Sequence, residues 1–516
     1  MTTATVPPPY RSDLKLGNDG FVQLLHAEWT KFRTVRGWVV AAAVAVAVMA
    51  LISISAATGG KGANCVNGKC QRGPSDPIGP YGVSVTDSFY FVHQTLDGDG
   101  SITARISSLT DAIQPDPQGQ GGAPPAGASV PWAKAGIIVK QSTTLGSQYA
   151  AVMATVGNGV RMQYNYEHDV AGNLGAASSA SPAWLRLVRS GTTLTGYDSA
   201  DGTHWTEIGT ADLTGLASTV QVGLFATSPG YNDNQYVFGG LNSDSFNSLA
   251  TAQFDNLALG GGWSGDAWNG DAIGGADGQY QQTGSGFTVQ GGNGDITPDV
   301  PDDDTARLAL SGAFAGLIAL IVIAAMFMTT EYRRGLLRTT LAASPRRGRV
   351  LAAKAVVVGA VSFAVGLVAA AVSVPVFNRL WSPDAFYPVG ALTEARVVLG
   401  TAALLAVVAV FTLALATLMR RSTAVITTVI ILVIMPYFLA TTSVLTPGPS
   451  DWLLRLTPAA GFAIQQTIPR FAQLTNVYTP TDGFYPLAPW SGFAVLCAYT
   501  AVALGAALLV LRRRDA

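Results

Sequence analysis

The chain has 516 residues, of which 49% are hydrophobic and 12% are charged, and its formal net charge is −1. A soluble globular protein carries about 25% charged residues, so the composition excludes an ordinary soluble chain, and the nearly balanced charge gives no sign of a nucleic-acid partner. The length predicts more than one domain.

Six stretches are long and apolar enough to cross a bilayer as helices, which takes about 20 residues. They cover residues 38–57, 308–328, 350–377, 397–419, 423–445 and 487–511. The first follows a polar segment, residues 1–37, and exceeds the roughly 7–15 apolar residues of a signal peptide, so we expect an uncleaved anchor. No span has an acidic residue or an arginine near its centre, which disfavours a proton-coupled carrier. Lys354, at one end of the third span, is expected to reach the interface with its long side chain.

The basic residues mark one side of the membrane. With six spans, every basic cluster falls on the same side: Lys31, Arg33, Arg36, Arg333, Arg334, Arg338, Arg346, Arg347, Arg349, Arg420, Arg421, Arg512, Arg513 and Arg514. The short loop 378–396 on the other side has only Arg379 and Arg396. Since cytoplasmic loops carry the excess of Lys and Arg, both termini are predicted to be cytoplasmic and residues 58–306 to be extracytoplasmic.

An amphipathic helix is predicted before the first span. Its apolar residues recur at helical spacing and share a face: Val22, Leu25, Trp29 and Phe32. Glu28, Lys31 and Arg36 fall away from that face. Such a helix lies in the headgroup plane, and a plain membrane-surface anchor is the simplest interpretation of it.

Two of the three cysteines form a close pair. Cys65 and Cys70 flank a short turn outside the membrane, which suits a small disulfide, with free thiols as the alternative. A zinc site needs about four ligands, and no second pair or nearby histidine pair accompanies these cysteines, so no metal is expected.

Residues 58–306 predict an all-β domain. Strand patterns occur at 101–107, 135–140, 149–155, 160–166, 184–189, 193–197, 220–226 and 251–257. Many short strands separated by turns indicate a sandwich, with its core at about 80–258. The Gly- and Asp-rich residues 259–305 predict a loosely ordered stalk.

No catalytic residues are predicted. A retaining glucanase needs two carboxylates about 5 Å apart, and the nearest approach, Glu167-His168-Asp169, does not have the required spacing. A phosphate-binding loop needs Gly-x-x-x-x-Gly-Lys-Ser/Thr, and Gly60-Lys61 is followed by Gly62. The chain is therefore not expected to be an enzyme or to hold a cofactor.

The loop between the second and third spans, residues 331–349, has features of a docking element. Leu336, Leu337, Thr340 and Leu341 can form one short helical face, which Ser344-Pro345 would end. A short helix with basic flanks suits a cytosolic protein partner, and binding to lipid headgroups is the alternative.

Three segments resemble the permease subunit of ABC exporters of the second export class (ABC type two). They are Ala27–Arg36, Glu331–Lys354 and the segment Asp451–Arg470 before the last span, and the first reads like actinobacterial relatives. The resemblance covers roughly residues 20–58 and 306–516. It implies that the loop after the second span is a coupling helix against an ATPase, with Glu331, Arg334, Gly335, Arg338, Thr340 and Leu341 as candidates. The N-terminal helix would also contact the ATPase, through Glu28, Trp29, Lys31 and Arg33.

The same resemblance implies a bacterial plasma-membrane exporter. ATP and Mg would bind a separate ATPase subunit, and two permeases would pair as a homodimer or a heterodimer. The segment 447–486 would form short helices that dip back into the membrane. The cargo is not indicated by the sequence.

The extracytoplasmic part resembles concanavalin-like (laminin-G-like) lectin and glucanase sandwiches. Residues 132–139, 184–191, 197–205 and 254–257 carry the similarity. The predicted fold class is thus a membrane all-α six-helix permease bundle with an inserted all-β sandwich. A different hypothesis is a membrane-anchored surface receptor, whose sandwich binds a cell-surface glycan.

Overall fold

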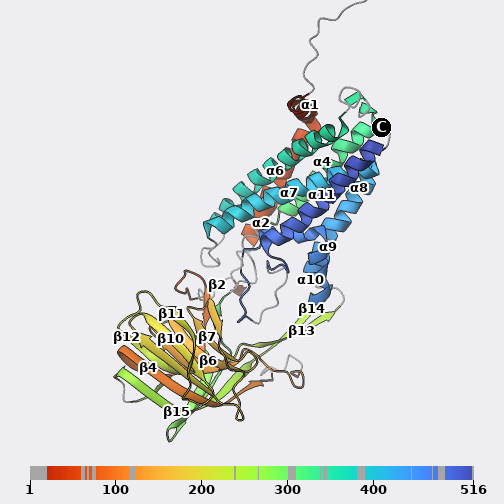
Figure 1. Cartoon of the computed structure of the whole chain (residues 1–516). Coiled ribbons are helices and arrows are strands. Elements are labelled where there is room, and N and C mark those ends of the chain that lie inside the picture. Colours follow the sequence, from red (N-terminus) through yellow and green to blue (C-terminus); the bar gives the residue numbers. More distant parts are fainter. Residues whose placement is uncertain are drawn as a thin grey trace, which may run out of the picture.

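In the computed structural model, a helical bundle and a large antiparallel β domain lie at opposite ends of the molecule (Figure 1). The structure describes residues 20–59, 64–66, 69–71, 77–115, 123–237, 240–264, 267–299, 310–336, 339–340, 346–380, 390–442, 444–467, 469–474 and 483–513. Helix α1 (Phe21–Thr34) and the C-terminal end of α11 (Pro489–Arg513) lie at the end of the bundle farthest from the β domain. The predicted fold class, membrane helices with an inserted β domain, is confirmed.

Among the residues that the structure describes, six helices are long and apolar enough to cross a membrane. They are α2 (Arg36–Gly59), α4 (Ala313–Arg333), α6 (Arg347–Leu380), α7 (Ala391–Met419), the consecutive helices α8 (Ser422–Val429), η2 (Ile430–Ile434) and α9 (Met435–Thr441), and α11. The fifth span widens into a π turn at η2, directly before Pro436. Proline lacks the N–H that continues an α-helix, and a local π turn is one adjustment by which a membrane helix accommodates it.

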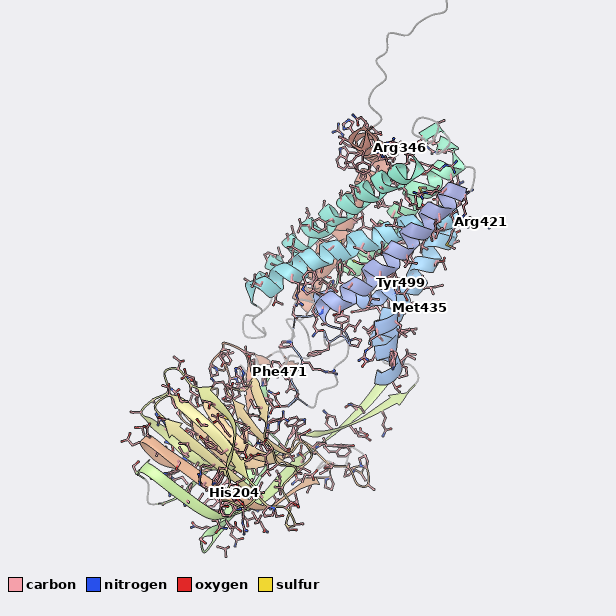
Figure 2. All side chains as sticks on the ribbon, in the orientation of Figure 1. His204, Arg346, Arg421, Met435, Phe471 and Tyr499 are labelled. Carbon is pink, nitrogen blue, oxygen red and sulfur yellow. The ribbon has the colours of Figure 1, made fainter. Side chains whose placement is uncertain are left out.

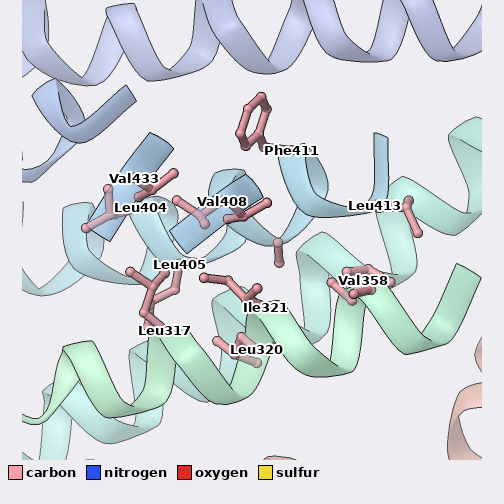
Figure 3. Close-up of a cluster of buried hydrophobic side chains, with 14 of the residues drawn as sticks. Leu317, Leu320, Ile321, Val358, Leu404, Leu405, Val408, Phe411, Leu413 and Val433 are labelled. Carbon is pink, nitrogen blue, oxygen red and sulfur yellow. The ribbon is translucent and has the colours of Figure 1, made fainter. Parts of the chain in front are cut away.

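Helix α7 is the centre of the bundle. In its most apolar window 67% of the residues are buried, compared with 17% for α2. Figure 3 shows Leu404, Leu405 and Val408 of α7 beside Leu317 and Ile321 of α4. Lipid tails are as apolar as leucine, so close packing rather than escape from water holds such helices together.

The segment before the last span inserts into the bundle. It contains α10 (Pro447–Leu456) and the 3₁₀ helix η3 (Pro458–Gln465), whose residues are all buried. Two glycines allow η3 to approach its neighbours: a Cβ at Gly400 of α7 would lie 2.4 Å from Ile464, and a Cβ at Gly492 of α11 would lie 2.3 Å from the carbonyl oxygen of Ala460. Short helices are therefore present in the described part of the segment 447–486, and glycine leaves space for η3. That they dip back into the membrane stays a prediction.

The β domain is organised around one long strand, β4 (Phe89–Ile113). Its first half pairs with β12 and β16, and its second half with β9 and β15, all antiparallel. The main sheet has the order β11-β10-β9-β4-β12-β5-β6-β7-β8, and β15 also pairs with β18, which pairs with β17. Its other strands are β5 (Lys134–Lys140), β6 (Tyr149–Thr155), β7 (Val160–Tyr164), β8 (His168–Ala171), β9 (Ala183–Ser190), β10 (Thr193–Ser199), β11 (Thr206–Asp212), β12 (Thr219–Thr227), β15 (Ser248–Trp263), β16 (Asn269–Ile273), β17 (Asp277–Thr283) and β18 (Gly286–Gly292).

Each predicted strand coincides with a strand of the structure, but the predicted stalk is wrong for its described residues. Strands β16, β17 and β18 lie between residues 269 and 292 and belong to the main sheet. Ile273, Phe287 and Val289 are buried in its core. The frequent glycines and aspartates of this segment concealed the alternation at Phe287 and Val289, which points two apolar side chains to the same face.

Beside the main sheet, the described part of the domain contains three two-stranded pairs, β13–β14, β1–β2 and β3–β19. A hairpin of β13 (Tyr231–Val237) and β14 (Gly240–Phe246) projects from it in the direction of the bundle (Figure 1). Strands β1 (Asn64–Val66) and β2 (Lys69–Gln71) place Cys65 opposite Cys70 in the backbone register. The side chains of these cysteines lie outside the described residues, so their disulfide stays a prediction.

The two segments that connect the β domain to the helical bundle lie side by side. Strand β3 (Val85–Asp87) pairs with β19 (Ile296–Pro298), and two lysines of β5 bind aspartates at one end of this pair. Lys140 lies 2.7 Å from Asp87, and Lys134 lies 2.5 Å from Asp295. Both lysines are fully buried, and burial lowers the pKa of Lys140 although Asp87 opposes this effect.

We expect Lys140→Met to destabilise the β domain by about 3–5 kcal/mol, because it leaves the Asp87 carboxylate buried without a counter-charge. Chemical unfolding of the purified full-length protein, followed by tryptophan fluorescence, measures the loss. Arg105→Met is the matched control: the Arg105–Asp255 pair is one-third exposed, and such pairs contribute about 0–1 kcal/mol. Equal effects of the two substitutions would contradict a role for the buried pair.

Candidate functional site

Four charged side chains meet at the end of the bundle that carries α1, which we call the basic end. The Lys354 ammonium of α6 lies 2.7 Å from a carboxylate oxygen of Glu28 in α1 and 2.6 Å from one of Glu331 in α4. Lys31 lies 2.7 Å from the other oxygen of Glu28 and 3.3 Å from Glu331. We call these four residues the ion cluster. It joins α1, the end of α4 and α6 by direct contacts.

The ion cluster is balanced in charge, and three of its four side chains are almost entirely removed from solvent. The side chains of Lys354, Glu28 and Glu331 are 0%, 1% and 7% exposed, and that of Lys31 is 38% exposed. Removing such charges from water costs several kcal/mol each, and only close opposite charges offset this. Burial alone would lower the pKa of Lys31, but its hydrogen bond to Glu28 and the charges of Glu28 and Glu331 raise it above the ordinary value.

Aromatic rings cover the membrane side of the ion cluster. The Lys354 ammonium lies 5.0 Å from the centre of the Phe327 ring, within the range of a cation–π contact. Phe327 also packs against Phe32 of α1 and Trp38 of α2, with ring centres 6.3 and 5.0 Å away. These rings exclude water from the charges and bring a fourth helix to the same point.

One expectation from the sequence is corrected here. Lys354 does not reach the interface but turns inward to two carboxylates, so the chain does contain buried ionisable residues at one end of its spans. Helix α1 buries Glu28 and Phe32 against the bundle, whereas Val22 is 72% and Trp29 is 44% exposed. Burial of Glu28 is not predictable from helical periodicity, because its counter-charge, Lys354, comes from α6.

The structure brings together some of the predicted coupling residues. Thr340 lies 3.5 Å from the Lys31 ammonium, which connects the loop after α4 to the ion cluster. Arg334 and Gly335 form an exposed turn, in which Gly335 has a φ of +68°, a conformation that glycine adopts without strain. Arg33 is exposed on α1. Arg338 and Leu341 lie outside the described residues.

The arginines of the short loops gather at the same end. Figure 2 shows Arg346 and Arg421 at the basic end, far from the β domain. Arg333, Arg334 and Leu336 are exposed there too. Among the described residues, no group of three or more His, Cys, Asp or Glu side chains is arranged to hold a metal ion.

A second contact ties the β domain to the segment before the last span. The Gln473 amide donates hydrogen bonds to the backbone oxygens of Tyr166 and Glu167, at 3.0 and 3.3 Å, and is buried. These oxygens are presented by a turn in which Asn165 and Tyr166 have left-handed φ values of 47° and 68°. The Tyr166 hydroxyl donates to Asp87 at 3.0 Å. Phe471, in the same segment as Gln473, lies between the bundle and the β domain (Figure 2).

A protein-family model described as "ABC-2 family transporter protein" matches residues 145–516, well over half of the chain. The chain belongs to the ABC-2 transporter family. It is therefore a membrane permease component of an ABC transport system. The ion cluster is part of this permease. The match begins inside the β domain, so it includes most of that domain as well as the last five spans.

Other comparisons add little about this ABC-2 permease. No curated protein matches it. Among solved structures, a protein of unknown function from Saccharomyces cerevisiae has 13% identity and a TM-score of 0.19, with 36% of this chain and 83% of that chain covered. Scytalido-glutamic peptidase, bound to a peptide-based transition-state analogue, has 9% identity and a TM-score of 0.22, with coverages of 40% and 98%. At these TM-scores neither likeness supports an inference about fold or function.

We expect Lys354→Met to destabilise the permease by about 3–5 kcal/mol and to release α1 from the bundle, because Glu28 and Glu331 then share a buried site with too little positive charge. Thermal unfolding in detergent and protease access to α1 measure the two effects.

Adding Glu331→Gln to Lys354→Met should restore most of the loss, since Glu28 then faces Lys31 alone. Arg333→Met, at an exposed position of α4, the helix of Glu331, is the control. It should change the free energy of unfolding by no more than about 0.5 kcal/mol. Failure of the double variant to recover would mean that the charge balance is not what Lys354 provides.

Proposed function

We propose that this ABC-2 permease is the membrane subunit of an ATP-driven exporter and that a separate ATPase docks on its basic end. Family membership and the accumulation of arginines at that end support the proposal. The observation that carries it is the ion cluster, which connects the loop after α4 to both α1 and α6.

In this mechanism the ATPase pushes on the loop after α4, where Arg333, Arg334 and Leu336 are exposed. ATP binding in the partner moves this loop, and the charged contacts of Lys31 and Lys354 transmit the movement to α1 and α6. A buried charge pair resists separation, because breaking it leaves uncompensated charges. The ion cluster thus makes the ends of three helices move together rather than singly.

The proposed orientation places the basic end and both termini in the cytoplasm of a bacterial cell. The excess of arginine at one end supports it. The β domain is then extracytoplasmic, and we propose that it is a concanavalin-like sandwich. Two copies of the permease, or two related permeases, would enclose the transport path.

The orientation predicts which positions an impermeant thiol reagent reaches. In a variant whose three cysteines are replaced by serine, single cysteines are introduced at Thr340, Asp515 and Ser179, the last in an exposed loop of the β domain. On intact cells we expect labelling at Ser179→Cys only, and labelling of the other two after permeabilisation. Labelling of Thr340→Cys or Asp515→Cys on intact cells would overturn the orientation.

The docking surface is tested by replacing Arg338 and Leu341 with alanine together. We expect the amount of co-purified ATPase to fall at least tenfold, or about 1.4 kcal/mol of binding free energy. Met419→Ala with Arg421→Ala removes an exposed apolar and a basic side chain from the same end and should leave co-purification unchanged. Equal ATPase recovery from both variants would show that the loop is not the docking surface.

A further inference from the structure

A cavity of about 650 Å³ lies at the end of the bundle nearer the β domain. The first turns of α7 and α11 line it, together with the segment that follows η3. Its volume falls within the range of about 300–1,000 Å³ that is usual for small-molecule sites. Neither the ion cluster nor the contact at Gln473 involves this cavity, so the transport mechanism proposed above leaves it without a role.

Arg396 is the charged residue among the described residues that line the cavity. It is half-buried in the second turn of α7, where it donates one hydrogen bond to the backbone oxygen of Gln466. A guanidinium has five N–H donors, and no second partner for Arg396 is found in the part of the chain that the structure describes. None of the described lining residues is a carboxylate. Glu394 is exposed and lies two residues away on the helix, so it points in a different direction.

The rest of the lining is partly polar and partly apolar. Thr393 and Thr467 add hydroxyl groups beside the arginine. Leu392 and Trp490, at the rim, are 89% and 65% exposed. Tryptophan is enriched where a membrane meets water, because its ring is both apolar and a hydrogen-bond donor. The cavity thus combines a guanidinium able to donate more hydrogen bonds with an apolar rim formed by Leu392 and Trp490, at a place where spans begin.

We propose that this cavity binds an anionic phospholipid of the leaflet on the β-domain side, with Arg396 on its phosphate group and Leu392 and Trp490 against its glycerol and acyl chains. A guanidinium binds phosphate oxygens in a two-point geometry. A free phosphate would bind Arg396 but would leave the apolar rim in water, whereas a lipid covers both parts. Naming the outer leaflet rests on the orientation proposed above.

The bound lipid would stabilise the packing of η3 between α7 and α11. Arg396 already connects α7 to the segment after η3 through Gln466. A phosphate on the remaining N–H groups would fix that side chain and so hold η3 against α7 and α11. The lipid is then a structural ligand of the inserted segment, and its removal should loosen that segment before it unfolds the bundle.

The test measures lipid binding to the purified full-length permease in detergent, without the ATPase, by native mass spectrometry. Phosphatidylglycerol is titrated, and phosphatidylcholine and inorganic phosphate are the comparison ligands. We expect a phosphatidylglycerol adduct that Arg396→Gln weakens at least tenfold. Leu392→Glu places a carboxylate at the rim, at a position that is 89% exposed, and should weaken it similarly. Arg455→Gln changes an exposed arginine of α10 and should have no effect.

Several results would overturn the proposal. They are equal binding of phosphatidylcholine and phosphatidylglycerol, competition by inorganic phosphate at concentrations near those of the lipid, and wild-type binding by either Arg396→Gln or Leu392→Glu. If Arg396→Gln does not elute as a folded protein, the phosphatidylglycerol binding of Leu392→Glu decides whether the proposal holds. Because the measurement needs neither transport nor the ATPase, its failure would leave the proposed function standing, and failure of ATPase docking would leave the lipid site standing.

Discussion

The basic end of this permease depends on the compensation of buried charge. Lys354 sits in an apolar helix with no exposure to solvent, and it is tolerable there because two carboxylates lie within hydrogen-bonding distance. Those carboxylates come from α1 and from the end of α4, so none of the three helices can leave without exposing an uncompensated charge to an apolar surrounding. The position of α1 on the bundle is therefore fixed by the ion cluster together with the packing of Phe32 against Phe327 and Trp38.

The β domain also depends on buried charge pairs, at the base where its two chain connections lie. An inserted domain must bring its two chain connections close together, and here they form the strand pair β3–β19. Lysines at the two ends of β5 fix this pair through Asp87 and Asp295. The Tyr166 hydroxyl joins the first of these pairs, and the Tyr166 backbone oxygen accepts from Gln473. The base of the domain is thus connected by short hydrogen bonds to the segment that packs against the last span.

These two connections lie at opposite ends of the same helices. At the basic end, charged contacts link α1, α4 and α6, and at the other end η3 fits between α7 and α11 because Gly400 and Gly492 lack side chains. Helix α7 has the largest buried share of the six spans and runs between the two ends. Under the transport mechanism proposed above, α7 is the packed helix that would relate the basic end to the segment beside the β domain.

The sequence by itself determined the six spans, their grouping of basic residues and most strands of the β domain, because hydrophobic length and alternation are local properties of a chain. It also indicated Glu28, Lys31, Glu331 and Thr340 as members of one functional region, through a family resemblance. Only the tertiary structure decided that Lys354 completes that region, that β16 to β18 continue the sheet and that Arg396 lines a cavity. Each of these depends on which distant residues meet: a charge is buried only where its counter-charge arrives from another helix, and a glycine-rich strand is ordered only by the strand it pairs with.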